Sequence, residues 1–484
     1  MPGLFLRLWL AVLFVGPLLY SGLSAQEPYS INKTFSPEEL RQDLDHLARY
    51  LPHFHPDPYR YISKDSLMKF VEFQKASITT PLTEREFRVY VKQVVAKIGC
   101  GHTDINASRA YNKAIKEVVR PLLPVNVFIT DSMKLMILND LSDTDGIFPG
   151  DEIVSIDHVP TQAILNRIFS TYTADGYINT SKRQGLRYDW FKYFYGLCYG
   201  FASEYKLGIK HQGQVTSYTL KARPSTKDSL YMSAKPAQDT IYKTKTCQFW
   251  MDKQHNDLAV IRIHSFDGRH WRKFYRKTFH YLRKHKVQNL VIDLRDNGGG
   301  DIGKGLAFMS YIIPKPFCVY FDRKPNLIPL SRHLRMPFSS RVTPILFTLS
   351  PLEFIRHGRL RHYMPGVPKH RNRYRNQVYV MVNGKTFSMS SIAASYLKYK
   401  AGATIVGEET GGCAMGSNAI VNGKLYLPHS GINISIPIYH IYHDLPLENN
   451  GRGVMPDYPV HYTVDDVFLG RDQDLEKVRA LIRK

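Results

Sequence analysis

The sequence has little of what metal or disulfide chemistry requires. Its 484 residues include only five cysteines, at positions 100, 198, 247, 318 and 413, and none of them forms a Cys-x-x-Cys pair. This spacing excludes the common zinc and redox motifs, so we predict neither a metal nor another cofactor. Because the number of cysteines is odd, at least one thiol has no partner within the chain.

Beyond its first 25 residues, the sequence lacks an apolar run long enough to span a bilayer. At the N-terminus, Arg7 precedes an apolar run from Leu8 to Leu19, and small residues follow up to Ala25. This pattern predicts a secretory signal peptide over residues 1–25, and an uncleaved N-terminal anchor is the alternative. The remaining length and a hydrophobic content of 43% predict a globular protein with two or three domains.

Acidic residues are in the minority, since 42 Asp and Glu face 65 Lys and Arg, for a net charge of +23. In an exported protein we expect no nucleic-acid partner, and association with anionic envelope polymers or acidic substrates is one interpretation of the charge. Solubility alone is the other interpretation. Residues 356–376 contain seven Lys or Arg, three His and no acid, which indicates either a docking patch for an acidic partner or a solvated basic loop.

Local patterns divide the rest of the chain into three predicted domains. Ser36 and Glu39 form a capping box at the start of a helical domain, which we place over residues 26–115. Short strands and a Pro-Gly-Asp turn predict a β-rich domain over 120–225, with an aromatic insertion near 171–202 that the pattern leaves unassigned. Continuous apolar strands alternate with helices over 245–484, which predicts an α/β core.

One glycine-rich segment imitates a nucleotide-binding loop. Residues Gly298 to Lys304 fit the spacing GxxxxGK, but Gly305 stands where a P-loop requires Ser or Thr to hold magnesium. We therefore exclude phosphate binding. The glycines are better explained as a close backbone approach to a substrate, with N–H groups free for an oxyanion.

A serine at a strand-to-helix junction is the candidate nucleophile. An apolar strand, Val378–Val382, leads through a turn into small hydroxyl residues and then a helix from Ser390 to Lys400. A serine at such a junction has its hydroxyl exposed beside the free N–H groups of the helix. We take Ser388 as that serine; its base, its orienting group and its oxyanion donors must come from elsewhere.

Six segments, in this order, resemble the tail-specific (carboxyl-terminal processing) serine peptidases, a family that includes the tricorn core and the interphotoreceptor retinoid-binding proteins. The six are Cys100–Thr103, Pro149–Asp157, Asp293–Gly300, Thr386–Ser390, Val406–Gly412 and Glu448–Asp457. The resemblance implies an α/β (α+β multidomain) fold with a crotonase-like α/β catalytic core, an N-terminal helical domain and a PDZ-like domain. It is closest to exported members of Bacteroidetes-like bacteria, which implies the periplasm or cell envelope of a Gram-negative bacterium, or secretion.

The resemblance also implies a site. One branch of the family pairs its serine with a lysine, but Cys413 occupies that lysine's position here. The tricorn-like branch uses Ser, His and Glu, which match Ser388, His102 and Glu448. In the implied mechanism His102 removes the serine proton, Ser388 attacks the scissile carbonyl and Glu448 orients His102. The implied oxyanion donors are the backbone N–H groups of Met389, Gly299 and Gly300.

The implied activity is hydrolysis of peptide bonds by an exported serine endopeptidase, with peptide tails captured by the PDZ-like domain. A non-catalytic peptide- or ligand-binding protein on the same scaffold is the alternative. Retention of all three triad residues favours the enzyme, although Gly101 stands where the tricorn-like branch has a serine. Cys100 and Cys413 fall beside the implied site, either as a pair or as two buried thiols. The sequence does not specify the substrate or the oligomeric state.

Overall fold

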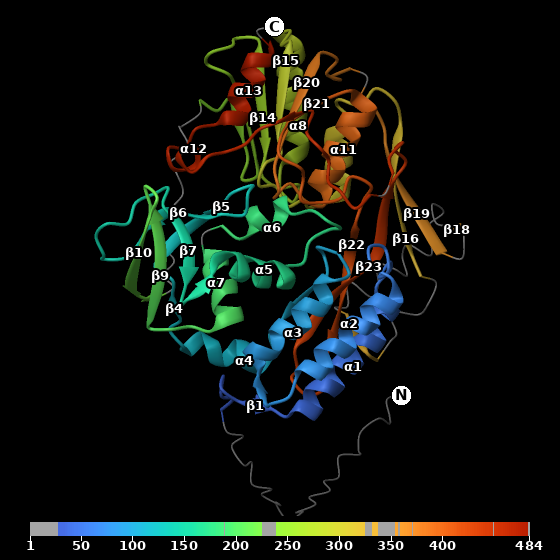
Figure 1. Cartoon of the computed structure of the whole chain (residues 1–484). Helices are drawn as coiled ribbons and strands as arrows, with labels where there is room; N and C mark the ends of the chain where they lie inside the picture. Colours follow the sequence, from blue (N-terminus) through green and yellow to red (C-terminus); the bar gives the residue numbers. More distant parts are fainter. Residues whose placement is uncertain are drawn as a thin grey trace, which may run out of the picture.

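The computed structural model describes residues 28–187, 189–224, 239–324, 332–336, 354–356, 359–369, 371–448 and 450–482. The predicted signal peptide, residues 1–25, and parts of the basic segment 356–376 lie outside the described residues. Within the described ranges, no helix is both long and apolar enough to cross a membrane. The predicted fold class is confirmed, because helices and several sheets form a mixed α/β protein of several parts (Figure 1).

Three helices make up most of the N-terminal part: α1 (Pro37–Phe54), α2 (Lys64–Ser77) and α3 (Glu84–Ala96). At the start of α1 the Ser36 hydroxyl accepts the Glu39 N–H, and the Glu39 carboxylate accepts the Ser36 N–H at 2.8 Å, which completes the capping box. This part is not separate from the core. Its strand β3 (Asp104–Asn106) pairs with the core strand β23 (Asn433–His443).

The β-rich part is an antiparallel sheet in the order β10-β9-β7-β6-β5. Its strands are β5 (Val125–Ile129), β6 (Leu135–Asp140), β7 (Glu152–Ile156), β9 (Glu204–His211) and β10 (Gln214–Lys221). Three helices accompany it: α5 (Thr161–Thr171), α6 (Thr180–Gly185) and α7 (Asp189–Tyr199). The insertion that the sequence left unassigned thus forms α6 and α7, and α6 lies between this sheet and the C-terminal α/β core (Figure 1).

The C-terminal α/β core has a seven-stranded sheet in the order β12-β13-β14-β15-β20-β21-β24. Its strands are β12 (Tyr242–Lys243), β13 (Cys247–Met251), β14 (Leu258–Ile263), β15 (Asn289–Asp293), β20 (Gln377–Val382), β21 (Thr404–Gly407) and β24 (Tyr458–Pro459). The strands from β14 to β24 run parallel, so their carboxyl ends share one edge. The helices beside this sheet are α8 (Trp271–Lys284), α11 (Met389–Ala401) and α13 (Gln473–Ile482).

A second, antiparallel sheet extends from the core toward the N-terminal helices (Figure 1). Its strands are β17 (Leu334–Arg335), β22 (Asn418–Tyr426), β23, β16 (Phe317–Arg323), β19 (Arg359–Gly366) and β18 (Phe354–Arg356). The remaining short elements are β1 (Thr34–Phe35), β2 (Leu82–Thr83), α4 (Arg109–Ala114), a 3₁₀ helix (Ile115–Glu117), β4 (Pro121–Leu122), β8 (Val159–Pro160), β11 (Arg223–Pro224), α9 (Ile302–Met309) and α12 (Val464–Phe468).

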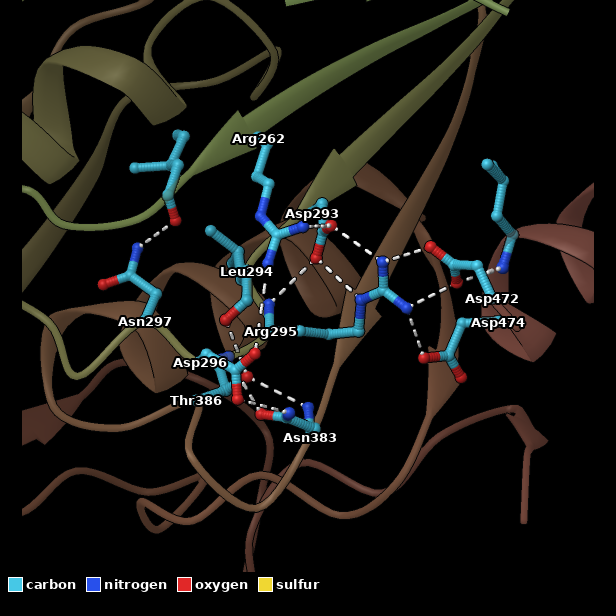
Figure 2. Close-up of polar contacts among 12 residues, drawn as sticks. Arg262, Asp293, Leu294, Arg295, Asp296, Asn297, Asn383, Thr386, Asp472 and Asp474 are labelled. Carbon is cyan, nitrogen blue, oxygen red and sulfur yellow. Dashed lines mark hydrogen bonds and ion pairs between the residues drawn. The ribbon is translucent and has the colours of Figure 1, made fainter. Parts of the chain in front are cut away.

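A buried ion-pair network fixes the C-terminal helix to the end of β15 (Figure 2). The Arg295 guanidinium contacts Asp293 at 2.9 Å, Asp472 at 2.6 Å and Asp474 at 2.8 Å. Burial disfavours the charge of Asp293 and of Asp472, but Arg295 outweighs it and lowers the pKa of both. At Asp474 burial prevails and raises the pKa to about 6. Arg295 therefore joins the end of β15 to the C-terminal segment that carries Asp472 and Asp474. It lies three residues before the glycine run Gly298–Gly300.

Candidate active site

Ser388 lies at the junction between β20 and α11, in a backbone conformation that residues other than glycine rarely adopt. Its φ is 55° and its ψ is −127°, and its hydroxyl does not cap α11. Such strain persists only where the surrounding structure imposes it. The hydroxyl is half-buried at the start of the helix and is free for chemistry.

Thr386 holds this junction in place. Its hydroxyl donates to the Leu294 carbonyl at 2.9 Å, which links the turn to the end of β15 (Figure 2). Its carbonyl accepts the N–H of Gly411 at 2.9 Å and the hydroxyl of Ser391 at 2.8 Å. Three segments that lie apart in the sequence therefore meet at Thr386, and this explains how a strained Ser388 is maintained.

Of the three predicted oxyanion donors, Met389 and Gly299 lie next to Ser388 and Gly300 follows Gly299 in the chain, and their N–H groups differ in availability. Gly299, at φ 110°, passes so close that an added Cβ would lie 2.7 Å from the Ser388 Cβ and 2.9 Å from the Met389 nitrogen. Its own N–H donates to the Asn297 side chain at 2.9 Å. In the part of the chain that the structure describes, no acceptor faces the N–H of Met389 or of Gly300. Met389 and Gly300 are therefore the two available donors.

The structure brings His102 to the nucleophile turn. Its ring stacks on the ring of Phe387, with 4.5 Å between centroids and 27° between planes. Gly101 permits this approach, since an added Cβ would lie 2.8 Å from the Phe387 ring. Burial lowers the pKa of His102, so its neutral, basic form prevails at neutral pH. Its Nδ1 is buried without a hydrogen-bond partner among the described residues, and none of the hydrogen bonds there joins His102 to Ser388.

The structure does not bring Glu448 to His102. The Glu448 side chain is exposed, and no hydrogen bond or ion pair of its carboxylate occurs among the described residues. Only its carbonyl is engaged, by the N–H of Asn450 at 3.1 Å. The triad geometry implied by the resemblance is therefore absent from this conformation.

The carboxylate beside His102 is instead Asp175, which is only 3% exposed. It accepts the N–H of Gly101 at 2.7 Å and the N–H of Cys413 at 3.4 Å. Burial raises the pKa of Asp175, and the nearby His102 opposes that shift; conversely, the Asp175 charge opposes the lowering of the His102 pKa. Sequence reasoning missed this residue because it lies in the unassigned insertion, where an Asp-Gly pair indicates only a turn.

Comparison with known proteins gives this site a context. Residues 257–460 match the family model described as peptidase family S41. Residues 257–460, which include Ser388, are therefore similar to the S41 peptidases. A carboxyl-terminal-processing protease of a Picosynechococcus species is 23% identical over 274 residues, which cover 56% of this chain and 55% of that relative. The chain thus matches about half the length of this curated relative.

Solved structures of mature CPAF have a similar fold over nearly the whole chain. One crystal structure has a TM-score of 0.63 at 15% identity and covers 92% of this chain and 97% of CPAF. The structure of CPAF complexed with lactacystin is equally similar and is covered to 98%. At this identity the likeness concerns the fold alone.

Cys100 and Cys413, beside this candidate site, are unpaired thiols, as are the other three cysteines. The Cys413 sulfur lies 3.2 Å from the Tyr61 hydroxyl, and the Cys100 sulfur accepts from the Asn418 amide at 3.7 Å. Burial raises the pKa of Cys413 to about 12 and that of Cys100 to about 11. Both are thus protonated and poorly nucleophilic. No cluster of side chains suited to a metal ion occurs among the described residues.

Proposed function

We propose that this chain is a serine endopeptidase in which Ser388 is the nucleophile and His102 is the general base. The observation that carries the proposal is the strained, uncapped Ser388 with the His102 ring stacked on the preceding residue. A binding protein has no need to hold a serine in this conformation next to a half-buried, neutral imidazole. The S41 match over residues 257–460 supports the same class of reaction.

In the proposed reaction, neutral His102 takes the Ser388 proton as the hydroxyl oxygen attacks the scissile carbonyl. The N–H groups of Met389 and Gly300 stabilise the oxyanion, and the imidazolium then gives its proton to the leaving amine. In the second half of the reaction, water attacks the acyl group on Ser388 while His102 takes a proton from the water. His102 then returns that proton to the departing Ser388 oxygen. The charge that forms on His102 is stabilised by Asp175, the one carboxylate close enough among the described residues to oppose the lowering of its pKa.

The proposal is tested by labelling with a fluorophosphonate, which reacts only with an activated serine. We expect stoichiometric labelling of the wild type and of the control Ser132→Ala, which removes an exposed hydroxyl in the turn between β5 and β6. Ser388→Ala is expected to remain unlabelled. A wild type that resists the label at every pH and concentration would instead favour the non-catalytic binding protein.

The two carboxylate candidates can be separated by pH profiles of kcat/KM. We expect Asp175→Asn to lower kcat/KM by about 10²–10⁴-fold, as loss of a carboxylate beside a catalytic histidine does. Because the Asp175 charge opposes the lowering of the His102 pKa, its removal should also shift the acid limb to lower pH.

Glu448→Gln is the matched comparison, since it replaces an exposed carboxylate by an amide. We expect it to leave the acid limb in place. A shift of the limb in Glu448→Gln but not in Asp175→Asn would mean that Glu448 orients His102 during turnover, as the family resemblance implies.

We further propose that the β-rich part captures peptide tails by strand addition. The two edge strands of its sheet differ in how exposed they are. All of β5 is buried and α6 contacts it, whereas β10 ends the other side of the sheet with most of its side chains exposed. Strand addition requires an unpaired edge, which favours β10. Export to the periplasm or cell envelope is likewise a proposal, which rests on the signal-peptide pattern of residues 1–25.

A further inference from the structure

A cavity apart from the candidate active site lies between the N-terminal helices and the helices of the β-rich part. It has a volume of about 430 Å³, and its walls come from α2, α3 and α5 with one residue of α6. Ligand sites typically have volumes of roughly 300–1,000 Å³. None of the residues assigned above to the active site lines this cavity, so any ligand here would occupy a separate site.

The cavity combines aromatic walls with uncompensated positive charge. Phe70, Phe73 and Phe169 contribute apolar surface, and Phe73 is 64% exposed. Lys97, Lys182 and Arg167 also line it, and none of the lining residues is acidic. In the described part of the chain no carboxylate lies within ion-pair distance of either lysine. Large exposed apolar side chains beside unpaired cations are typical of a binding site rather than of plain surface.

The two lysines are held where their charges repel. Lys97 lies over the Phe70 ring at 4.8 Å, and Lys182 donates to the Phe169 carbonyl at 3.3 Å. Burial lowers the pKa of Lys182, and the charge of Lys97 lowers it further. An anion between the two ammonium groups would relieve both effects.

A chain of polar groups crosses the same cavity. The Gln74 amide donates to Gln93 at 3.1 Å, and the Gln93 amide donates to the Ser170 hydroxyl at 3.0 Å. All three residues line the cavity, and they come from three different helices. Side-chain amides can both donate to and accept from a peptide backbone, whereas a purely hydrocarbon ligand would leave them unmatched.

We propose that this cavity binds the C-terminal end of a peptide whose last residues are apolar. Its α-carboxylate would lie between Lys97 and Lys182, its side chains would contact the aromatic wall and its backbone would face the glutamines. The inference rests on the proposed function in one respect, because peptide hydrolysis generates such carboxylates. One chain segment links the two sites: Lys182 follows Ser181, which lies 3.1 Å from a Cβ added at Gly411, and the Gly411 N–H donates to the Thr386 carbonyl at 2.9 Å.

Binding is measured by fluorescence anisotropy on full-length Ser388→Ala protein, so that it does not depend on catalysis. The probe is a hexapeptide with an N-terminal fluorophore, three apolar residues at its end and a free carboxylate; the comparison is the same peptide as a C-terminal amide. We expect the acid to bind at least about tenfold more tightly, since ionic hydrogen bonds give that much discrimination. Adding Lys97→Gln and Lys182→Gln should remove the difference between acid and amide.

Lys64→Gln is the matched control, because it removes one exposed lysine at the start of α2 that does not line the cavity. It should preserve the preference for the acid. Equal affinity for acid and amide, or an unchanged preference after both cavity lysines are replaced, would overturn the proposal. Displacement of the peptide by decanoate at a lower concentration than by the unlabelled peptide acid would identify a fatty acid as the ligand and equally overturn it. Fluorophosphonate labelling fails or succeeds independently of these outcomes.

Discussion

Replacement of His102 by alanine is expected to lower kcat/KM for peptide hydrolysis by about 10²–10⁴-fold, the usual contribution of a general acid–base group. The reason is that Ser388 then lacks a base, while the strained turn and the free N–H groups of Met389 and Gly300 remain. Steady-state kinetics with a fluorogenic peptide measures the loss. In Ser388→Ala the second substitution should add little, because residues that act as one unit lose activity non-additively.

His280→Ala serves as the control, since His280 is exposed on α8 and far from the nucleophile turn in the sequence. It should retain wild-type activity. Full activity in His102→Ala would contradict the assignment of the base. If His102→Ala is inactive and also melts well below the wild type, the loss of activity could come from unfolding. His102→Gln distinguishes the two causes, because it retains the size of the side chain and should fold normally yet remain inactive.

The largest effect on stability is expected at Arg295. Replacement by methionine should lower the free energy of unfolding by about 3–5 kcal/mol, because loss of one partner leaves buried charges uncompensated. Three carboxylates would be affected, on Asp293, Asp472 and Asp474. Urea unfolding at pH 7 measures the change. Arg276→Met is the control: that arginine is exposed on α8 and has no carboxylate partner among the described residues.

The pH dependence of this loss distinguishes charge from packing. Arg295 lowers the pKa of Asp293 and of Asp472, so their stabilisation is present above about pH 4, the unfolded value, and is lost as the pH falls through the lower folded values. The difference between wild type and Arg295→Met should therefore shrink in acid. Burial raises the pKa of Asp474 to about 6, so the contribution of this group to wild-type stability is lost as the pH rises from about 4 to 6. Arg295 opposes that rise in pKa, so its own effect on Asp474 also weakens in acid. A loss that is equal at pH 3 and pH 7 would mean that Arg295 acts by packing alone.

The sequence predicted the local features that depend on neighbouring residues. The capping box at Ser36, the strand Val378–Val382 and the helix after Ser388 all follow from short-range hydrogen bonding and side-chain periodicity, and the structure contains each of them. Four hydroxyl residues follow this strand, namely Thr386, Ser388, Ser390 and Ser391, and the choice of Ser388 among them rested on the order of the six family-like segments. Its backbone strain agrees with that choice but is not visible in the sequence, because φ depends on what Thr386 and Gly299 contact.

The sequence by itself therefore determined the mixed α/β fold class and the residue types that peptide hydrolysis needs. Only the tertiary structure decided which carboxylate lies at His102. Asp175 reaches it because a loop of the insertion folds onto the histidine segment, where the Gly176 N–H donates to the Gly99 carbonyl at 2.9 Å. The physical reason is that a buried carboxylate is stabilised by N–H groups from distant segments, here Gly101 and Cys413, and no periodicity or spacing encodes such long-range contacts.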